Sequence, residues 1–264
     1  LIPIYLVAAV WSLCFLVVVN VIKGHGISIE ELFQKVLMYA YGSAYSGWLE
    51  PNGPLWFLLA YFFFVNIIFI IEKYRLVRWF ILTGLACVTV AIYQLHISYL
   101  PFTIHASILA VPFYYFGKWL KNKKIGQYSK ATSITLAIAS LLLCIVFNLV
   151  IGIRIDISNS LVMPYWFFLV CPVLMTIFFL ITSQLLSGYH HLANILSYLG
   201  KNTLVILCYH IPFIVACAFV ISKVTGIDYE ELRSQTLTVA IITLILPLSI
   251  VKISEYGAVS KLLG

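Results

Sequence analysis

Charged side chains are scarce in this sequence: Asp, Glu, Lys and Arg together make up 9% of its 264 residues, whereas hydrophobic residues make up 63%. Soluble domains are typically about 25% charged and about 45–50% apolar, so this composition excludes an ordinary soluble globule. The apolar runs are continuous and do not alternate in period two, which argues against a transmembrane β-barrel. An open sheet is excluded because its edges would leave backbone groups unpaired in lipid. The sequence therefore predicts an all-α fold, a polytopic transmembrane helical bundle that forms a single membrane-embedded domain over residues 1–264.

Spacings typical of metal ligands are also missing. The adjacent His190 and His191 lack the i, i+4 spacing of common zinc sites, and we place both, with His25, in loops. The cysteines all lie inside apolar runs, where buried thiols are the expected form: Cys14, Cys87, Cys144, Cys171, Cys208 and Cys217. We therefore predict no metal site and no disulfide framework.

Eight apolar runs are long enough to cross a membrane, since a helical span needs about 20 largely apolar residues. We predict about eight spans, at residues 1–22, 54–71, 79–97, 104–120, 131–151, 163–186, 202–222 and 236–253. Single amides inside them are expected to form hydrogen bonds between helices: Asn20, Asn66, Gln94 and Asn148.

The basic residues lie in short loops between the apolar runs, where they set orientation, so the net charge of +7 does not indicate a nucleic-acid partner. When successive loops are assigned to alternate sides, the side that should be cytoplasmic holds eleven: Lys73, Arg75, Arg78, Lys118, Lys121, Lys123, Lys124, Lys130, Lys201, Lys252 and Lys261. The outer side holds five: Lys23, Lys35, Arg154, Lys223 and Arg233. We predict a multi-pass protein of the cell membrane with both ends of this chain facing the cytoplasm.

Helix-start signals occur in two loops on the predicted outer side. Ser28 and Glu31 form a capping-box pattern. The apolar residues that follow fall at helical spacing: Ile29, Leu32, Phe33, Val36 and Leu37. We predict a short amphipathic helix on the outer membrane face. Asp228 and Glu231 predict a second helix start before the last span.

Two histidines in or beside the spans are the candidate catalytic residues, because polar groups are costly inside a membrane and default to functional hypotheses. His210 lies about eight residues into its span and two before Pro212, which removes a backbone donor and disturbs the preceding turn. Such a histidine could act as a general base near neutral pH. The alternative is a histidine hydrogen-bonded to a neighbouring span. His105 opens the fourth span after Pro101, where an interfacial histidine is the alternative.

The segment 48–58 combines an acid, an amide, two prolines, a glycine and two tryptophans at the predicted outer boundary. Trp48 and Trp56 could stack on sugar rings, while Glu50 and Asn52 could form hydrogen bonds with hydroxyl groups. These four residues are therefore candidates for acceptor binding. The alternative is an ordinary interfacial aromatic belt with Pro54 at a helix entry.

The densest basic patch runs from Lys118 to Lys124 on the predicted cytoplasmic side. Its simplest function is to set topology. It could also attract a phosphorylated cytoplasmic ligand such as coenzyme A, with Lys118 and Lys121 as contacts. Lys201 and Asn202 open the seventh span on the same side, where a helix N-terminus favours an anion.

Four segments carry a family resemblance. Residues 197–210, Ser-Tyr-Leu-Gly-Lys-Asn-Thr-Leu-Val-Ile-Leu-Cys-Tyr-His, fit a pattern of Gly-Lys-Asn-Ser/Thr followed by a histidine. Residues 53–58 read Gly-Pro-Leu-Trp-Phe-Leu, and Leu-Pro-Phe-Thr-Ile-His at 100–105 is paired with Pro-Phe-Tyr-Tyr-Phe-Gly at 112–117. With the opening Leu-Ile-Pro-Ile-Tyr, these segments resemble the acyltransferase type 3 family of integral membrane acyltransferases, especially its sugar O-acetyltransferase-like branch.

The resemblance implies a bundle of about ten helices that moves an acyl group, acetyl in particular, from cytoplasmic acyl-CoA to a hydroxyl of a sugar or glycan. The family's catalytic histidine on its first helix and an Arg-x-x-Arg pair before its third would then lie upstream of Leu1. Arg75-Leu-Val-Arg78 has this spelling but follows a different helix, so it is not assigned that role. The chain opens without Met or a basic segment, and we expect it to be part of a longer polypeptide that supplies two further helices.

Two other functions stay open at this point. A transporter or exporter of a glycan or lipid would also have many spans and a proline-interrupted polar helix. Against it, the spans hold almost no charged residues for ion coupling and show no internal repeat. A non-catalytic membrane sensor is the third possibility. The favoured prediction is an acyl-CoA-dependent O-acyltransferase for a cell-envelope polysaccharide, surrounded by membrane lipid.

Overall fold

The computed structural model describes residues 1–22, 26–43, 45–74, 78–95, 97, 99–122, 129–151, 154–156, 161–163 and 165–227. The chain divides into two compact units. The first unit combines Leu1–Leu59 with Ser197–Gly264, and the second is Ala60–Leu196.

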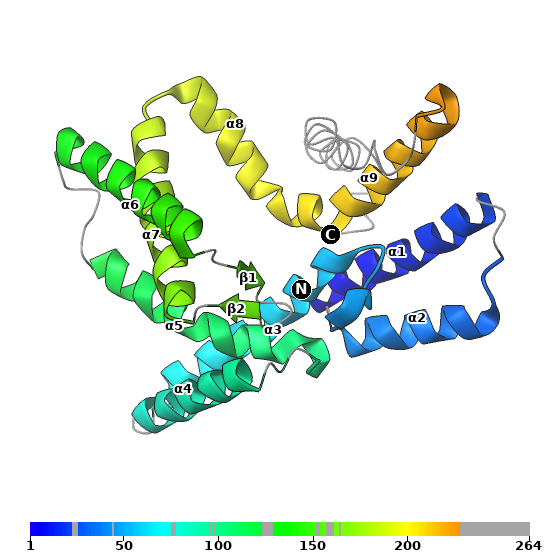
Figure 1. Cartoon of the computed structure of the whole chain (residues 1–264), viewed down its shortest axis with the longest axis horizontal. Coiled ribbons are helices and arrows are strands. Elements are labelled where there is room, and N and C mark those ends of the chain that lie inside the picture. The colour runs from blue at the N-terminus through cyan, green and yellow to red at the C-terminus, as the bar shows by residue number, and fades with distance from the viewer. Residues whose placement is uncertain are drawn as a thin grey trace. The chain divides into compact units, whose positions relative to one another are not determined.

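Long helices occupy the predicted spans (Figure 1). They are α1 (Ile2–Ile22), α3 (Trp56–Lys73), α4 (Arg78–Gln94), α5 (Ile104–Asn122), α6 (Lys130–Ile151), α7 (Tyr165–Leu186) and α9 (Thr203–Thr225). Within the described residues, five segments are long and apolar enough to cross a membrane: Ile2–Val21, Gly53–Lys73, Lys130–Val150, Phe168–Leu186 and Thr203–Thr225. The prediction of a helical transmembrane fold is thereby confirmed. The apolar part of α4, Arg78–Ile92, is shorter, and the predicted last span at 236–253 lies outside the described residues.

Three elements in the second half of the chain were not predicted. Two short antiparallel strands, β1 (Arg154–Asp156) and β2 (Leu161–Met163), lie between α6 and α7. The helix α8 (His190–Lys201) precedes α9. The assignment of His190 and His191 to a loop was therefore wrong, because both lie in the first turn of α8.

The predicted amphipathic helix is α2 (Ile29–Tyr41), and its capping box is confirmed. The backbone N–H of Glu31 donates to Ser28 Oγ at 3.1 Å, and the backbone N–H of Ser28 donates to Glu31 Oε2 at 3.0 Å. These two bonds satisfy donors that a helix N-terminus otherwise leaves unpaired. The helix ends at Gly42, whose φ of 66° is the left-handed conformation that glycine adopts without a steric cost.

The helix α2 lies beside α1. Figure 1 shows α2 running back beside α1 in the direction opposite to it. The hydroxyl of Tyr5, in the first turn of α1, donates a hydrogen bond to the backbone carbonyl of Tyr39, near the end of α2. The chain that follows α2 is therefore carried back along α1, and this return positions the candidate site.

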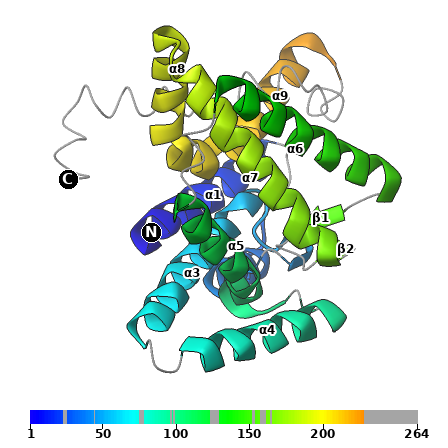
Figure 2. The same ribbon diagram turned by 90° about the vertical axis from the view of Figure 1, so that its left-hand side faces the viewer.

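In the second unit, α6 and α7 pack side by side, as Figures 1 and 2 both show. One buried cluster joins Ile92 of α4, Leu109 of α5 and Phe168 of α7. A salt bridge of 2.9 Å between Glu72 and Lys118 connects the ends of α3 and α5. The buried cluster forms an apolar core in the second unit, and the salt bridge adds a polar contact outside that core.

Candidate functional site

Asn52 is a buried polar residue of the first unit that connects two of its helices. Its side chain is fully buried, and its Nδ2 donates to Ser12 Oγ of α1 at 3.0 Å and to the backbone carbonyl of Cys208 in α9 at 2.6 Å. Ser12 Oγ in turn donates to the Ala8 carbonyl at 2.7 Å. The Oδ1 atom of Asn52 is buried and has no hydrogen-bond partner. One amide therefore connects two spans, and its remaining acceptor is open to a ligand or water.

Pro212 explains why the Cys208 carbonyl accepts a bond from outside its helix. In an α-helix the N–H of residue 212 would donate to the carbonyl of residue 208, but proline has no N–H. Pro212 is buried within α9, so water cannot readily replace the missing donor. The Asn52 amide takes that place. Pro212 thus leaves the Cys208 carbonyl without its helical donor, and Asn52 supplies one, although 156 positions separate Asn52 from Cys208.

The hydrogen bond to Ser12 also fixes the depth of Asn52. Ser12 is the middle residue of the 21-residue α1, so Asn52 lies at the level of the centre of this candidate span. Asn52 also directly precedes the candidate span Gly53–Lys73, and its position at the outer membrane boundary stays a prediction. Two short 3₁₀ turns, η1 (Tyr45–Gly47) and η2 (Gly53–Leu55), then carry the chain into α3.

His210 lies in α9, two residues after Cys208, and is partly buried. Its Nδ1 lies 2.9 Å from the carbonyl oxygen of Ile206 and 3.1 Å from that of Leu207. A carbonyl only accepts, so these contacts place the proton on Nδ1 and leave Nε2 of the neutral ring with a lone pair. This tautomer is the one a general base needs. Within the part of the chain that the structure describes, the ring bonds inside its own helix through Nδ1.

Asn52 contacts α9 at the carbonyl of Cys208, and His210 follows two residues later in the same helix. Successive residues of an α-helix are rotated by about 100°, so residues two apart face roughly opposite directions. Tyr209, between Cys208 and His210 in sequence, packs its ring edge-on against Trp11 of α1, with ring centroids 6.4 Å apart. Asn52 therefore bonds the backbone of α9 two residues before His210.

Tyr39 holds the segment that contains Asn52 in place. Its hydroxyl donates to the Leu49 carbonyl at 2.9 Å, and both residues are buried. Burial raises the pKa of Tyr39 to about 12, so this hydroxyl stays protonated and remains a donor near neutral pH. The roles of Tyr39 and Ser12 were not predicted from the sequence. The missing N–H of Pro212 could have signalled that an outside donor was needed, but not which one.

The two tryptophans and the acid of segment 48–58 have separate surroundings. The Trp48 ring is partly buried between the rings of Tyr41 and Tyr45, at centroid distances of 5.4 and 5.5 Å. Trp56 begins α3 and lies edge-on to Phe57. Glu50 is exposed.

Gly47 gives the Glu50 side chain its position. It has a φ of 73°, and a Cβ atom added there would lie 2.9 Å from Glu50 Oε1. The backbone N–H of Glu50 donates to the Gly47 carbonyl at 2.9 Å. A carboxylate on a loop at the depth of a span is costly in lipid, which keeps Glu50 among the candidate residues.

The candidate coenzyme A contacts also have defined positions. Lys201 is the last residue of α8 and does not open α9 as predicted, whereas Asn202 is the N-cap residue of α9. The Asn202 side chain donates to the Tyr198 carbonyl at 2.9 Å. In the second unit, Lys118 is engaged by Glu72, whereas Lys121 in the last turn of α5 is exposed.

His105 belongs to the second unit, where its side chain is fully buried in the first turn of α5. It follows the 3₁₀ turn η3 (Pro101–Thr103), in which Phe102 and Thr103 have φ values of 56° and 52°. Each such backbone costs about 1–3 kcal/mol, and this type of strain is concentrated at functional sites. The strained turn is an independent reason to keep His105 as a candidate.

Over the described residues, no group of three or more His, Cys, Asp or Glu side chains is arranged to hold a metal ion. The family model for an acyltransferase domain, that of the acyltransferase type 3 family, matches residues 1–252. The match covers almost the entire chain. No curated protein and no solved structure matches the chain.

Proposed function

Since the chain belongs to the acyltransferase type 3 family of membrane acyltransferases, we propose that it transfers an acyl group from acyl-CoA to a hydroxyl group of a sugar. The acyl group is acetyl, the donor binds on the cytoplasmic side, and the acceptor is a sugar unit of a cell-surface glycan. The family match supports acyl transfer as the class of reaction. The single structural observation that supports the chemistry is that His210 Nδ1 lies within hydrogen-bond distance of two backbone carbonyl oxygens, which leaves Nε2 as the proton acceptor of a neutral ring.

His210 is the proton acceptor in this proposal. Its Nε2 takes the proton of the acceptor hydroxyl as that oxygen attacks the thioester carbonyl carbon. The carbon–sulfur bond then breaks, and the proton passes from Nε2 to the departing coenzyme A thiolate. The Nδ1–H bonds to Ile206 and Leu207 hold the ring orientation during both transfers. His105 is a separate candidate catalytic residue of the second unit, on the evidence of its strained turn.

The donor phosphates are proposed to bind where α9 begins. The unpaired N–H groups of a helix N-terminus favour an anion, and the Lys201 ammonium lies next to them in sequence. Asn202 would contribute its remaining amide N–H. Lys121 is the candidate of the second unit, whereas Lys118 contributes mainly through its salt bridge with Glu72.

The acceptor is proposed to contact Trp48, Trp56 and Glu50. Aromatic rings offer an apolar face to a sugar, and a carboxylate accepts hydrogen bonds from hydroxyl groups. Asn52 already uses its Nδ2 for Ser12 and Cys208, so it can offer only Oδ1 to a ligand. Its main part in the proposal is to position the turn that carries His210.

Turnover of labelled acetyl-CoA by the full-length protein in proteoliposomes tests this proposal. His210→Ala should lower transfer to a glycan acceptor about 10²- to 10⁴-fold, the usual range for loss of a general base. His210→Gln should lose as much, because an amide can keep a hydrogen bond but cannot accept the proton. His191→Ala is the matched control, since His191 is an exposed histidine of α8.

Transfer that is unchanged in His210→Ala would remove His210 from the chemistry. Transfer that is absent from the wild-type protein with every acyl-CoA and glycan offered would reject the acceptor class or the enzyme assignment. Uptake of the glycan into the proteoliposomes without acylation would favour the alternative function, a transporter of a glycan or lipid.

A further inference from the structure

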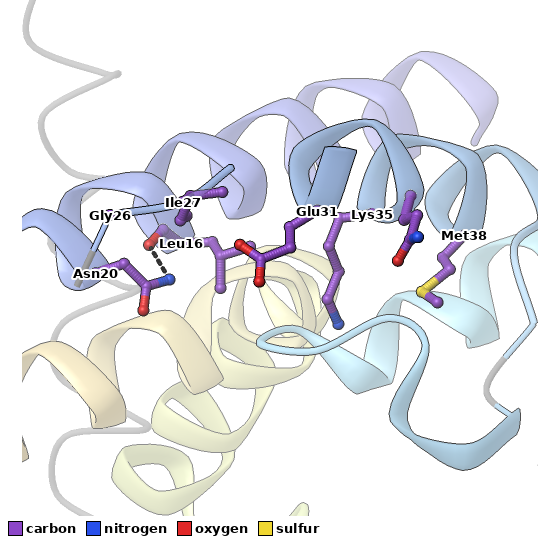
Figure 3. A pocket seen from close by; sticks show the side chains of 8 residues that line it. Leu16, Asn20, Gly26, Ile27, Glu31, Lys35 and Met38 are labelled. Atoms are coloured by element: carbon purple, nitrogen blue, oxygen red, sulfur yellow. Dashed lines mark hydrogen bonds between the residues drawn. The ribbon is translucent and has the colours of Figure 1, made fainter. Parts of the chain in front are cut away.

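A pocket of about 350 Å³ lies between α1 and α2 in the first unit. Side chains from both helices line it, including Leu16 and Asn20 of α1 and Glu31, Gln34, Lys35 and Met38 of α2. Figure 3 shows Glu31, Lys35 and Met38 reaching from α2 toward the space beside α1. Small-molecule sites measure about 300–1,000 Å³, so this pocket suits one compact group and not a long chain.

The polar atoms of the pocket are a mixture of donors and acceptors without a net charge. Asn20 donates from Nδ2 to the Leu16 carbonyl at 3.1 Å, which leaves its Oδ1 as an acceptor. Glu31 binds the Ser28 N–H through Oε2, which leaves Oε1. Lys35 supplies N–H donors and cancels the charge of Glu31, and Gln34 supplies both kinds of group.

This mixture selects one ligand chemistry. An anion would need an excess of positive charge, and an alkyl chain would need walls without Glu31, Gln34 and Lys35. Hydroxyl groups both donate and accept, so a neutral ring with several hydroxyl groups pairs with every polar group present. Leu16 and Met38 supply the apolar surface that the carbon side of such a ring contacts.

The position of the pocket connects it to the buried site. Leu16 lies one helical turn after Ser12, the partner of Asn52, and Met38 precedes Tyr39, which holds the Asn52 segment. At its other end the pocket reaches Gly26 and Ile27, on the predicted outer side. We propose that this pocket binds a neutral sugar ring and that this ring is the acceptor on its way to the site. The second part rests on the proposed function.

Saturation-transfer NMR on the full-length protein in lipid nanodiscs tests the binding directly. Methyl β-glucopyranoside is the neutral probe, and the corresponding methyl glucuronide is the anionic one. Asn20→Leu and Gln34→Leu should weaken glucoside binding about five- to tenfold, as loss of a hydrogen bond does. Gln34 is exposed, so its variant should fold even if Asn20→Leu does not.

The matched control is Asn66→Leu. Asn66 of α3 is an exposed amide that donates to its own i−4 carbonyl, Phe62, as Asn20 does to Leu16, but it lies outside the pocket. This variant should bind the glucoside like the wild type. Equal binding by all variants, or tighter binding of the glucuronide, would overturn the proposal.

Acyl transfer measured on the same proteins separates the two proposals. If the glucoside binds through the pocket but no protein transfers acetyl, the pocket stands as a sugar site and the acyltransferase proposal fails. If transfer proceeds and the KM for the glycan acceptor is unchanged in Asn20→Leu and Gln34→Leu, the enzyme stands and the acceptor pocket is wrong.

Discussion

At the scale of single residues, Asn52 should stabilise the protein more than any exposed amide does. Replacing it by Leu leaves the Cys208 carbonyl without its donor in the interior and removes the bond that Ser12 Oγ accepts, although Ser12 still donates to Ala8. An unsatisfied buried polar group costs about 1–3 kcal/mol, so Asn52→Leu should lower the free energy of unfolding by about that amount. Unfolding in detergent micelles measures the change. Asn66→Leu, at an exposed position of α3, should stay close to the wild type.

A double-mutant cycle with Pro212→Ala provides the sharper form of this test. An alanine at position 212 restores the N–H that can donate to the Cys208 carbonyl within α9. Asn52→Leu should then cost less in the Pro212→Ala background than in the wild type, with a coupling of about 0.5–3 kcal/mol. Additive effects of the two substitutions would show that the proline and the asparagine do not act as one unit.

At the scale of helices, apolar run length predicted where the long helices lie, and the capping box of α2 predicted where that helix begins. Asn20 and Asn66 were expected to bond to other helices, but each donates to the i−4 carbonyl of its own helix. The helix α8 was missed because its apolar stripe is short and is interrupted by polar residues. Length and composition identify a span, whereas a short surface helix depends on what covers its apolar side.

The helix α8 should lie in the membrane interface. Leu192, Ile195, Leu196 and Leu199 fall at i, i+3, i+4 and i+7, and no residue of α8 is buried within the protein. Such a helix places its apolar stripe at the boundary between headgroups and acyl chains. A spin label at Ile195 should be relaxed by dissolved oxygen, which concentrates in lipid, and one at Asn194 by a water-soluble nickel chelate. Both positions are exposed, so equal nickel accessibility at the two sites would contradict this placement.

At the scale of the whole chain, the pairing of distant segments could not be predicted from the sequence. Hydropathy predicts that α1 and α9 are spans, but it does not predict which apolar faces pack against each other. The contacts that define the site are polar and lie far apart in sequence, as between Asn52 and Cys208. The return of α2 along α1 was not predicted either, because it depends on one hydroxyl of α1 that bonds the end of α2.

The orientation of the chain is the remaining prediction at this scale. The helices α2 and α8 have 13 and 12 residues, and at about 1.5 Å per residue neither reaches across a hydrocarbon core of about 30 Å. Neither therefore changes the alternation of loops between the two sides. The excess of Lys and Arg then predicts that Lys121 is cytoplasmic and that Ile227, after α9, is outside.

Cysteine labelling of intact cells checks this orientation. A membrane-impermeant maleimide should label Ile227→Cys in intact cells and Lys121→Cys only after the membrane is opened, since both positions are exposed. The native cysteines lie within helices, and the unmodified chain measures their background. Labelling of Lys121→Cys in intact cells would reverse the orientation. Lys201 and the start of α9 would then face away from the cytoplasm, and donor binding there would be excluded.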